Sequence, residues 1–191
     1  MTRSSSLNGS ASRRAALVLG SLVLASFTAL GARAQDQPPD AAYVRIVAEH
    51  FRVAPEEVRV LIRAGAVAEE LPVPLRISNR SGIPPTVLLT LHRRGDSWLG
   101  VAGRYGLGAE IFHVVIPPDQ VDDRIRRVWE LYRDTPEARW GTLRLSDPEV
   151  VILANLQLLT RATGSTPGRV LEARERAGSF PGAVRLLVGR P

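Results

Sequence analysis

The sequence predicts an all-α fold, in a single helical domain that spans residues 41–191. Two observations support this prediction. Apolar residues recur at helical spacings through most of that range. One pattern of proline and glycine, typical of helical hairpins, also occurs three times along it. We therefore expect three degenerate helical hairpins and one inserted helix between the second and third copies.

Residues 1–34 have the features of a signal peptide. Arginines precede an apolar run over residues 15–30, and Ala32-Arg33-Ala34 supplies the small side chains that signal peptidase requires. We expect cleavage after Ala34 and a mature protein that is periplasmic or secreted. An uncleaved anchor is the alternative, but the run is shorter than the roughly 20 residues of a membrane-spanning helix.

The export route stays open between two pathways. Ser12-Arg13-Arg14-Ala15-Ala16-Leu17 resembles the twin-arginine signal, and glycine, serine and threonine dilute the apolar run that follows. General secretion is the equal alternative. On either route, the only membrane contact that we expect is the transient one of the signal peptide.

Composition excludes several classes of function. The chain has no cysteine, so disulfides, thiolate metal sites and cysteine nucleophiles are impossible. It also has no lysine, which excludes a phosphate-binding loop of the Walker type. The leader holds four of the 25 arginines and none of the 19 acidic residues, so the mature chain carries only +2. This balance argues against nucleic acid as a partner.

The mature chain begins with a polar tether and an amphipathic helix. Residues 35–40 are polar and contain proline, whereas Tyr43, Val44, Val47 and Phe51 lie on one face of a helix that begins at Ala41.

The repeated pattern places proline in the first turn of a helix and glycine near its end. Both residues suit those positions, because proline lacks the N–H that is unpaired there and glycine accepts positive φ. In the first two copies, Pro55, Val58, Leu61 and Gly65 correspond to Pro85, Leu88, Leu91 and Gly95. In the third, 82 residues after the second, Gly164, Pro167, Val170 and Phe180 correspond to Gly82, Pro85, Leu88 and Trp98.

The helix before the third copy has the clearest start signal. Ser146-Asp147-Pro148-Glu149 combines an N-cap hydroxyl, an early proline and a glutamate three residues after the cap. The apolar residues that follow cover more than one face, so this helix should be central and the most buried.

The insertion of about fifty residues before that helix is less regular. The short apolar run over residues 112–116 fits a strand or a turn, and Pro117-Pro118 ends it. The predicted inserted helix carries Val121, Ile125, Val128, Trp129 and Tyr132 at helical spacing, and a loop with Trp140 and Gly141 follows.

The insertion also holds the candidate binding surface. Aromatic faces stack on sugar rings and arginine binds anionic groups, so this composition fits a cell-wall polymer or an acidic partner. The alternative is that the aromatic residues are core and the arginines solvated. The candidate residues are Arg124, Arg127, Trp129, Tyr132 and Trp140.

No catalytic, metal or cofactor site is predicted. The three histidines do not pair at ligand spacing, and no Gly-x-Ser-x-Gly motif is present. The acidic pairs Glu56-Glu57, Glu69-Glu70 and Asp122-Asp123 lie where carboxylates stabilise helix N-termini. An enzyme therefore requires a histidine and carboxylates that only the fold brings together.

Residues 95–106, from Gly95-Asp96-Ser97-Trp98 to Arg104-Tyr105-Gly106, resemble the centre of a LysM module. This resemblance implies a βααβ fold and binding to N-acetylglucosamine polymers. A LysM strand has aromatic and aliphatic residues five and three places before the glycine, where this chain has Thr90 and His92. The helical repeat accounts for Gly95 and Trp98 without strands.

Residues 70–188 resemble a group of exported, functionally uncharacterised helical proteins of Gram-negative bacteria. The strings that carry this resemblance are Gly95 to Trp98, Glu110-Ile111-Phe112, Leu145-Ser146-Asp147 and Gly178-Ser179-Phe180. It implies a single helical domain and no particular activity. We therefore expect a non-enzymatic binding or scaffold protein, with a peptidoglycan binder and an enzyme as the alternatives.

Overall fold

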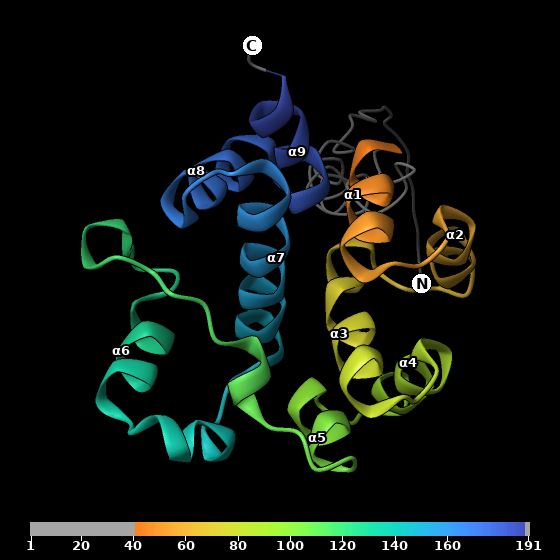
Figure 1. Cartoon of the computed structure of the whole chain (residues 1–191), viewed down its shortest axis with the longest axis horizontal. Coiled ribbons are helices and arrows are strands. Elements are labelled where there is room, and N and C mark those ends of the chain that lie inside the picture. Colours follow the sequence, from red (N-terminus) through yellow and green to blue (C-terminus); the bar gives the residue numbers. More distant parts are fainter. Residues whose placement is uncertain (1–40, 190–191) are drawn as a thin grey trace, which may run out of the picture. The chain divides into compact units, whose positions relative to one another are not determined.

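The computed structural model describes residues 41–189. This range contains nine α-helices, four short 3₁₀ helices and no β-strand (Figure 1), which confirms the all-α prediction. None of its helices has the length and apolar character needed to cross a bilayer. The predicted signal peptide (1–34) and tether (35–40) lie outside the described residues.

The elements follow one another with short connections. The α-helices are α1 (Ala41–Phe51), α2 (Pro55–Arg63), α3 (Pro72–Ser81), α4 (Pro85–Arg93), α5 (Trp98–Gly103), α6 (Arg126–Asp134), α7 (Asp147–Thr163), α8 (Pro167–Ala177) and α9 (Phe180–Val188). The 3₁₀ helices are η1 (Ala68–Glu70), η2 (Ala109–Phe112), η3 (Pro118–Gln120) and η4 (Glu137–Thr142).

The three predicted hairpins are α1–α2, α3–α4 and α7–α8, whose helices contact each other pairwise. Proline opens the second helix of each hairpin, where no intrahelical partner exists for an N–H. Gly82 and Gly164 end α3 and α7 with φ of 75° and 67°, a left-handed conformation that glycine adopts without strain.

The second and third copies each contain a third helix that the sequence analysis does not predict. The hydroxyls of Ser97 and Ser179 accept the N–H groups of Gly100 and Gly182 at 3.1 Å, and these N-caps begin α5 and α9. We call α3–α5 repeat A and α7–α9 repeat B.

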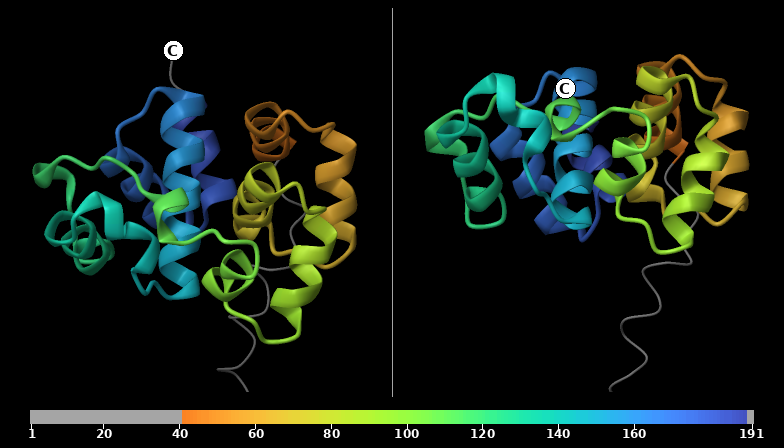
Figure 2. Two further views of the ribbon diagram at one scale, coloured as in Figure 1. Left: turned by 60° about the horizontal axis from the view of Figure 1, so that its bottom comes forward. Right: turned by 90° about the horizontal axis from the view of Figure 1, so that it is seen from below.

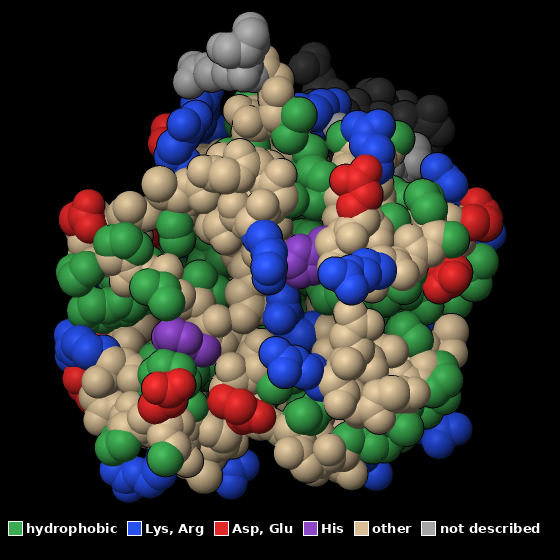
Figure 3. All heavy atoms as spheres, viewed as in Figure 1, with side chains coloured by type: hydrophobic (Ala, Val, Ile, Leu, Met, Phe, Trp, Pro, Cys, Tyr) green, Lys and Arg blue, Asp and Glu red, His purple; other side chains and the backbone are tan. Residues whose placement is uncertain are grey.

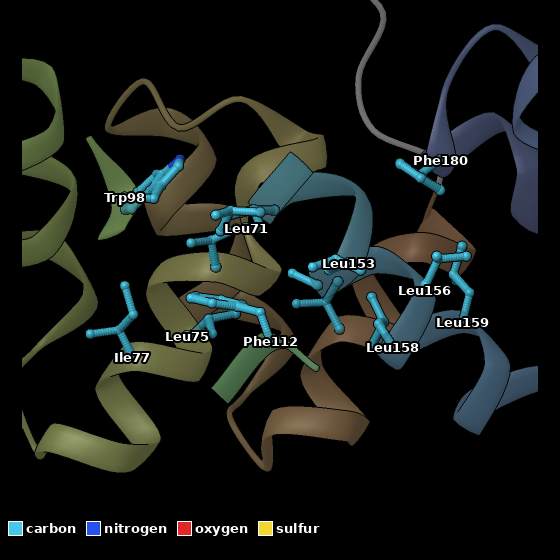
Figure 4. Packing of buried hydrophobic residues seen from close by; sticks show 14 of the residues in the cluster. Leu71, Leu75, Ile77, Trp98, Phe112, Leu153, Leu156, Leu158, Leu159 and Phe180 are labelled. Atoms are coloured by element: carbon cyan, nitrogen blue, oxygen red, sulfur yellow. The ribbon is translucent and has the colours of Figure 1, made fainter. Parts of the chain in front are cut away.

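Helix α7 is the centre of the structure, as its sequence predicts. It contacts α1, α3, α5, α8 and α9, and its leucines meet side chains of repeat A in the core shown in Figure 4. The only buried polar residue within the described range is Asn155. Its amide accepts the Tyr43 hydroxyl at 2.7 Å and donates to the carbonyl of Glu69 at 2.7 Å, so it ties three segments together.

The insertion lies between α5 and α7. Figures 1 and 2 show α6 on one side of α7, with α3 and α4 on the other. The inserted helix is present but starts at Arg126, so the expectation of a helix that also carries Val121 and Ile125 was wrong. The Asp122 side chain accepts the N–H of Arg124 at 2.9 Å, and this turn competes with the helix there.

The structure differs from two further expectations about loops. Trp140 and Gly141 belong to the 3₁₀ helix η4, not to an irregular loop. Residues 112–116 are neither a strand nor a single turn, because Phe112 ends η2 and residues 113–117 carry no regular structure. Around residues 95–106, the helices α4 and α5 occupy the segment where a LysM module has a strand and its first helix.

Candidate functional site

The aromatic side chains of the insertion meet around a partly open pocket of about 180 Å³. Its walls come from four segments: the stretch after η2, helix α6, η4 and the middle of α7. The residues that matter for its chemistry are His113, Val128, Trp129, Tyr132, Trp140 and Leu153. We call this site the aromatic pocket.

Backbone carbonyls hold the rings of the pocket in place. The indole N–H of Trp129 donates to the carbonyl of Ile116 at 3.0 Å. The hydroxyl of Tyr132 donates to the carbonyl of Ala109 at 2.6 Å. Since these polar groups are already paired inside the protein, the rings present mainly carbon surface to a ligand.

Trp140 is fixed from η4 in the same way. Its indole N–H lies 3.1 Å from the carbonyl of Tyr132 and 2.9 Å from that of Thr135. The ring of His113 lies over it, with 4.0 Å between centroids. Burial lowers the pKa of His113 below its usual 6.5, so this ring is neutral at pH 7.

Two glycines allow the walls of the pocket to approach each other. A Cβ on Gly108 would lie 2.2 Å from the carbonyl oxygen of Gly141, closer than any real Cβ contact. The carboxylate of Glu110 also accepts the N–H of Gly108 at 2.9 Å. The close approach of Gly108 to Gly141 brings η2 next to η4, the two segments that carry His113 at their edge and Trp140.

The structure unites the three predicted aromatic residues but places the two predicted arginines elsewhere. Arg124 pairs with Asp122 and with Glu175, the latter at 3.1 Å. Arg127 pairs with Glu149 at 2.5 Å, next to the start of α7. The cation at the pocket is Arg133, which belongs to the same concentration of aromatic and basic residues in the sequence but is not one of the five candidate residues.

Arg133 covers the outer face of the pocket. Its guanidinium carbon lies 4.7 Å from the ring centroid of Trp129, and its Nε bonds to Asp134 at 2.7 Å. The interaction resembles other arginine–indole pairs at exposed sites, where the cation favours the ring face. Its signal in the sequence is the i, i+4 spacing from Trp129.

A second cluster brings one histidine and two carboxylates together, as the enzyme alternative requires. His92 of α4 lies 4.0 Å from Glu70 and 4.0 Å from Asp147. Its ring stacks on Trp98 with 3.9 Å between centroids. Asp147 also accepts the backbone N–H of Trp98 at 2.7 Å, so it caps the N-terminus of α5.

Repeat B contains the equivalent of this cluster. Arg174 occupies the position of His92, 82 residues later, with its guanidinium carbon 5.0 Å from the ring centroid of Phe180. Glu69 accepts the N–H of Phe180 at 2.5 Å and lies 3.7 Å from Arg174. In each repeat, a carboxylate from outside the repeat's own third helix caps that helix and faces the basic residue.

The duplication explains the histidine cluster without catalysis. Arginine stays protonated in proteins and transfers no proton, yet Arg174 performs the same stacking and pairing as His92. The Nδ1 atom of His92 is also engaged, 2.8 Å from the carbonyl of Asp96. This geometry gives His92 and Asp147 structural tasks and adds no support to an enzyme.

Metal binding receives no support from side-chain positions either. Within residues 41–189, no three histidine or acidic side chains converge in a way that could hold a metal ion. No protein-family model, curated protein or solved structure matches the chain. The geometry of the described residues is therefore the basis for a functional proposal.

Proposed function

We propose that this chain is an exported, non-enzymatic binding protein that holds an apolar side chain of a partner protein in the aromatic pocket. The observation that carries this proposal is the state of the pocket's polar groups. The N–H groups of Trp129 and Trp140 and the hydroxyl of Tyr132 all donate to backbone carbonyls. A ligand therefore meets ring surfaces and the aliphatic side chains of Val128 and Leu153.

The size of the pocket favours a single side chain as its occupant. Sites for drug-sized molecules and cofactors enclose roughly 300–1,000 Å³, whereas the aromatic pocket encloses about 180 Å³. Tight protein interfaces depend on a few apolar anchors that fill well-packed pockets of this kind. Val115, which is 79% exposed, adds apolar surface next to the pocket.

A cell-wall glycan is the second candidate, because partly exposed aromatic rings also stack on sugars. Sugar hydroxyls, however, require convergent polar groups beside the stacking platform. His113 and Arg133 are the pocket residues with side-chain polar atoms not spent on the backbone, and Arg133 already pairs with Asp134. The pocket therefore fits an apolar anchor better than a glycan.

Export follows from the predicted signal peptide and places the partner outside the cytoplasm. The proposed partner is a protein of the periplasm or cell exterior, and the cell-wall polymer is the alternative.

The repeats supply a rigid support for the pocket, since α7 contributes Leu153 to the pocket floor from the centre of the core.

Selection of peptides from a random displayed library tests the proposal. The selection uses residues 35–191 in the native form and as two variants, Trp140→Ala in the pocket and Trp98→Phe in repeat A. Co-sedimentation of the same three proteins with purified peptidoglycan runs in parallel.

The expected result is a family of peptides with a shared apolar anchor, which bind the native chain and Trp98→Phe but lose at least about tenfold in affinity for Trp140→Ala. A different outcome is that Trp140→Ala abolishes binding to peptidoglycan and that no peptides with a shared apolar anchor are selected. That outcome would show that the partner is the glycan and not a protein. If neither peptide binding nor peptidoglycan binding depends on Trp140, the aromatic pocket is not the binding site.

A further inference from the structure

Helices α1, α3 and α7 bring four basic side chains together on one face of the molecule. His50 lies in the last turn of α1, Arg76 and Arg80 lie one turn apart on α3, and Arg161 lies near the end of α7. Figure 3 shows arginine side chains and a histidine along the centre of this face, between α7 and α3. We call these four residues the arginine cluster.

Arg76 is the innermost member of this cluster. Its guanidinium carbon lies 5.9 Å from the ring centroid of Phe51, which itself contacts the ring of His50. The Nε atom is buried and has no hydrogen-bond partner within the described residues. Burial, together with Arg80 and Arg161, lowers the pKa of Arg76 to about 10, so the group is still charged at pH 7.

The charge of the cluster is not balanced by the described part of the protein. The two charged groups that shift the pKa of Arg76 are the arginines Arg80 and Arg161. Those that shift the pKa of His50 are Arg76 and Arg161. Several arginines elsewhere in the described residues pair with acids, as Arg124 does with Glu175. Partly buried cations normally have a counter-charge, because desolvation and like-charge repulsion both cost free energy.

This arrangement reduces stability in the absence of a ligand. Arg76 and Arg80 are an i, i+4 pair of like charges, which destabilises a helix, and the packing of α3 against α7 adds Arg161. Groups that are kept at a cost to stability are characteristic of functional sites. An anion bound between the two helices would recover that free energy.

We propose that the arginine cluster is a binding site for a phosphoryl group. A phosphoryl group carries up to two negative charges and three strong acceptor oxygens, whereas a carboxylate has one charge and two oxygens. Three guanidinium groups that approach from two helices match the former better. His50, neutral at pH 7, supplies a further donor from α1.

The site is separate from the aromatic pocket. The cluster lies on α1, α3 and α7, and the insertion supplies most of the pocket residues. Failure of one proposal therefore leaves the other untouched, and the Trp140→Ala variant distinguishes them. That variant should bind phosphate as the native chain does.

Titration with inorganic phosphate at constant ionic strength, adjusted with sodium chloride, tests the inference. Binding is followed by NMR of the arginine Nε–H and histidine ring signals, and stabilisation by the shift in melting temperature. Glycerol phosphate and acetate are titrated in the same way. The variants are Arg161→Gln, Arg80→Gln and Arg76→Met, with Arg139→Gln as the matched control.

Arg139 suits this purpose because it lies exposed in η4, so its loss removes one positive charge outside the cluster. We expect saturable phosphate binding that falls about tenfold or more in Arg161→Gln and Arg76→Met and stays unchanged in Arg139→Gln. If Arg76→Met does not fold, the exposed Arg161 and Arg80 variants carry the test.

Two results would overturn the inference. One is a phosphate response that sodium chloride reproduces at equal ionic strength, or that Arg139→Gln lowers as much as Arg161→Gln does. The other is acetate binding as tight as that of phosphate, which would remove the preference for a phosphoryl group. Tighter binding of glycerol phosphate than of phosphate would support the inference and assign a phosphate ester as the ligand.

Discussion

Trp98 in repeat A and Trp140 in the insertion each contact a histidine ring, but the two indoles differ in how deeply they are buried. A histidine ring covers each indole, at 3.9 Å for Trp98 and 4.0 Å for Trp140. Trp98 is completely buried, and its Nε1 has no hydrogen-bond partner among residues 41–189. Trp140 is partly exposed, and its Nε1 lies near two carbonyls. Helix α5, which carries Trp98, packs against α4 and α7, whereas Trp140 lies in the short 3₁₀ helix η4 beside the aromatic pocket.

The same contrast extends to the other aromatic residues. Phe180 of repeat B is as buried as Trp98, and each ring opens a helix whose first N–H is capped by a carboxylate from another segment. In the insertion, Trp129 and Tyr132 lie on helix α6, which forms one wall of the aromatic pocket. The 3₁₀ helix η4 forms another wall. We conclude that the repeats form the framework and that the insertion leaves Trp129 and Trp140 partly exposed at the aromatic pocket.

Truncation of a framework ring should have the largest effect. Trp98→Ala and Phe180→Ala each remove a buried aromatic side chain, which typically costs about 3–5 kcal/mol. For a chain of this size, that loss lowers the melting temperature by about 6–20 °C. Thermal and urea unfolding measure both quantities.

Trp98→Phe is the matched control for this prediction. It retains a ring and copies the residue of repeat B. The indole N–H that it removes has no partner in the described part of the chain, so it should cost much less than Trp98→Ala. A loss of stability in Trp98→Phe as large as in Trp98→Ala would contradict the equivalence of the two repeats.

Removal of the capping carboxylates should have the next largest effect. Asp147→Ala and Glu69→Ala each leave the first N–H of a short helix unpaired, and each should lower the free energy of unfolding by about 1–2 kcal/mol. Asp119→Ala, an exposed acidic residue in η3, should change it by less than about 0.5 kcal/mol. Urea unfolding at pH 7 provides the measurement. A loss in only one of the two capping variants would show that the device is not duplicated.

Truncation in the insertion should cost less than in the framework. Trp140→Ala removes a partly exposed ring from a short 3₁₀ helix, so we expect a loss of about 1 kcal/mol, the typical value for a single substitution. Urea unfolding of Trp140→Ala beside Trp98→Ala gives the direct comparison. Equal losses would make Trp140 a framework residue and remove the distinction between the two regions.

The hairpins could be predicted from the sequence because their signals are local. Proline and glycine act on the backbone wherever they occur, and Glu149 accepts both the N–H and the hydroxyl of Ser146 at the predicted start of α7. The third helices were missed although Ser97-x-x-Gly100 and Ser179-x-x-Gly182 carry a repeated N-cap signal. Helix α5, with six residues, is too short to show apolar periodicity.

The sites could be predicted only in part, because they depend on contacts between distant segments. The concentration of aromatic residues in the insertion indicated Trp129, Tyr132 and Trp140. His113 joins them because distant segments meet: Gly108 approaches Gly141, and the Gln157 side chain of α7 donates to the carbonyl of His113 at 2.7 Å. Arg76 and Arg161 lie far apart in the sequence and meet because α3 packs on α7. No local pattern marks either convergence.

The histidines should also differ between the two regions, with a smaller effect on stability. Burial and the cations Arg76 and Arg161 lower the pKa of His50 to about 4. Burial alone lowers that of His113, and Glu137 opposes the shift. Both rings should therefore titrate below 6.5 in an NMR titration, with His50 the lower.

Stability should fall as the pH decreases through this window. Below 6.5 the unfolded chain binds protons that folded His50 does not bind until about pH 4, so protonation favours unfolding. Between pH 7 and pH 4 the native chain should therefore lose more stability than His50→Gln does. A His50 that titrates at or above 6.5 would contradict the cluster of cations around it.

The most direct test of the division between framework and pocket uses the three tryptophans together. Their indole N–H groups give three NMR signals, which are followed while N-acetyl-leucinamide, a capped apolar side chain, is added at millimolar concentration. We predict that the signals of Trp129 and Trp140 shift with a common saturation curve while that of Trp98 stays in place. A shift of Trp98 as large as the other two, or shifts of Trp129 and Trp140 with an N-acetylglucosamine trimer but not with N-acetyl-leucinamide, would contradict it.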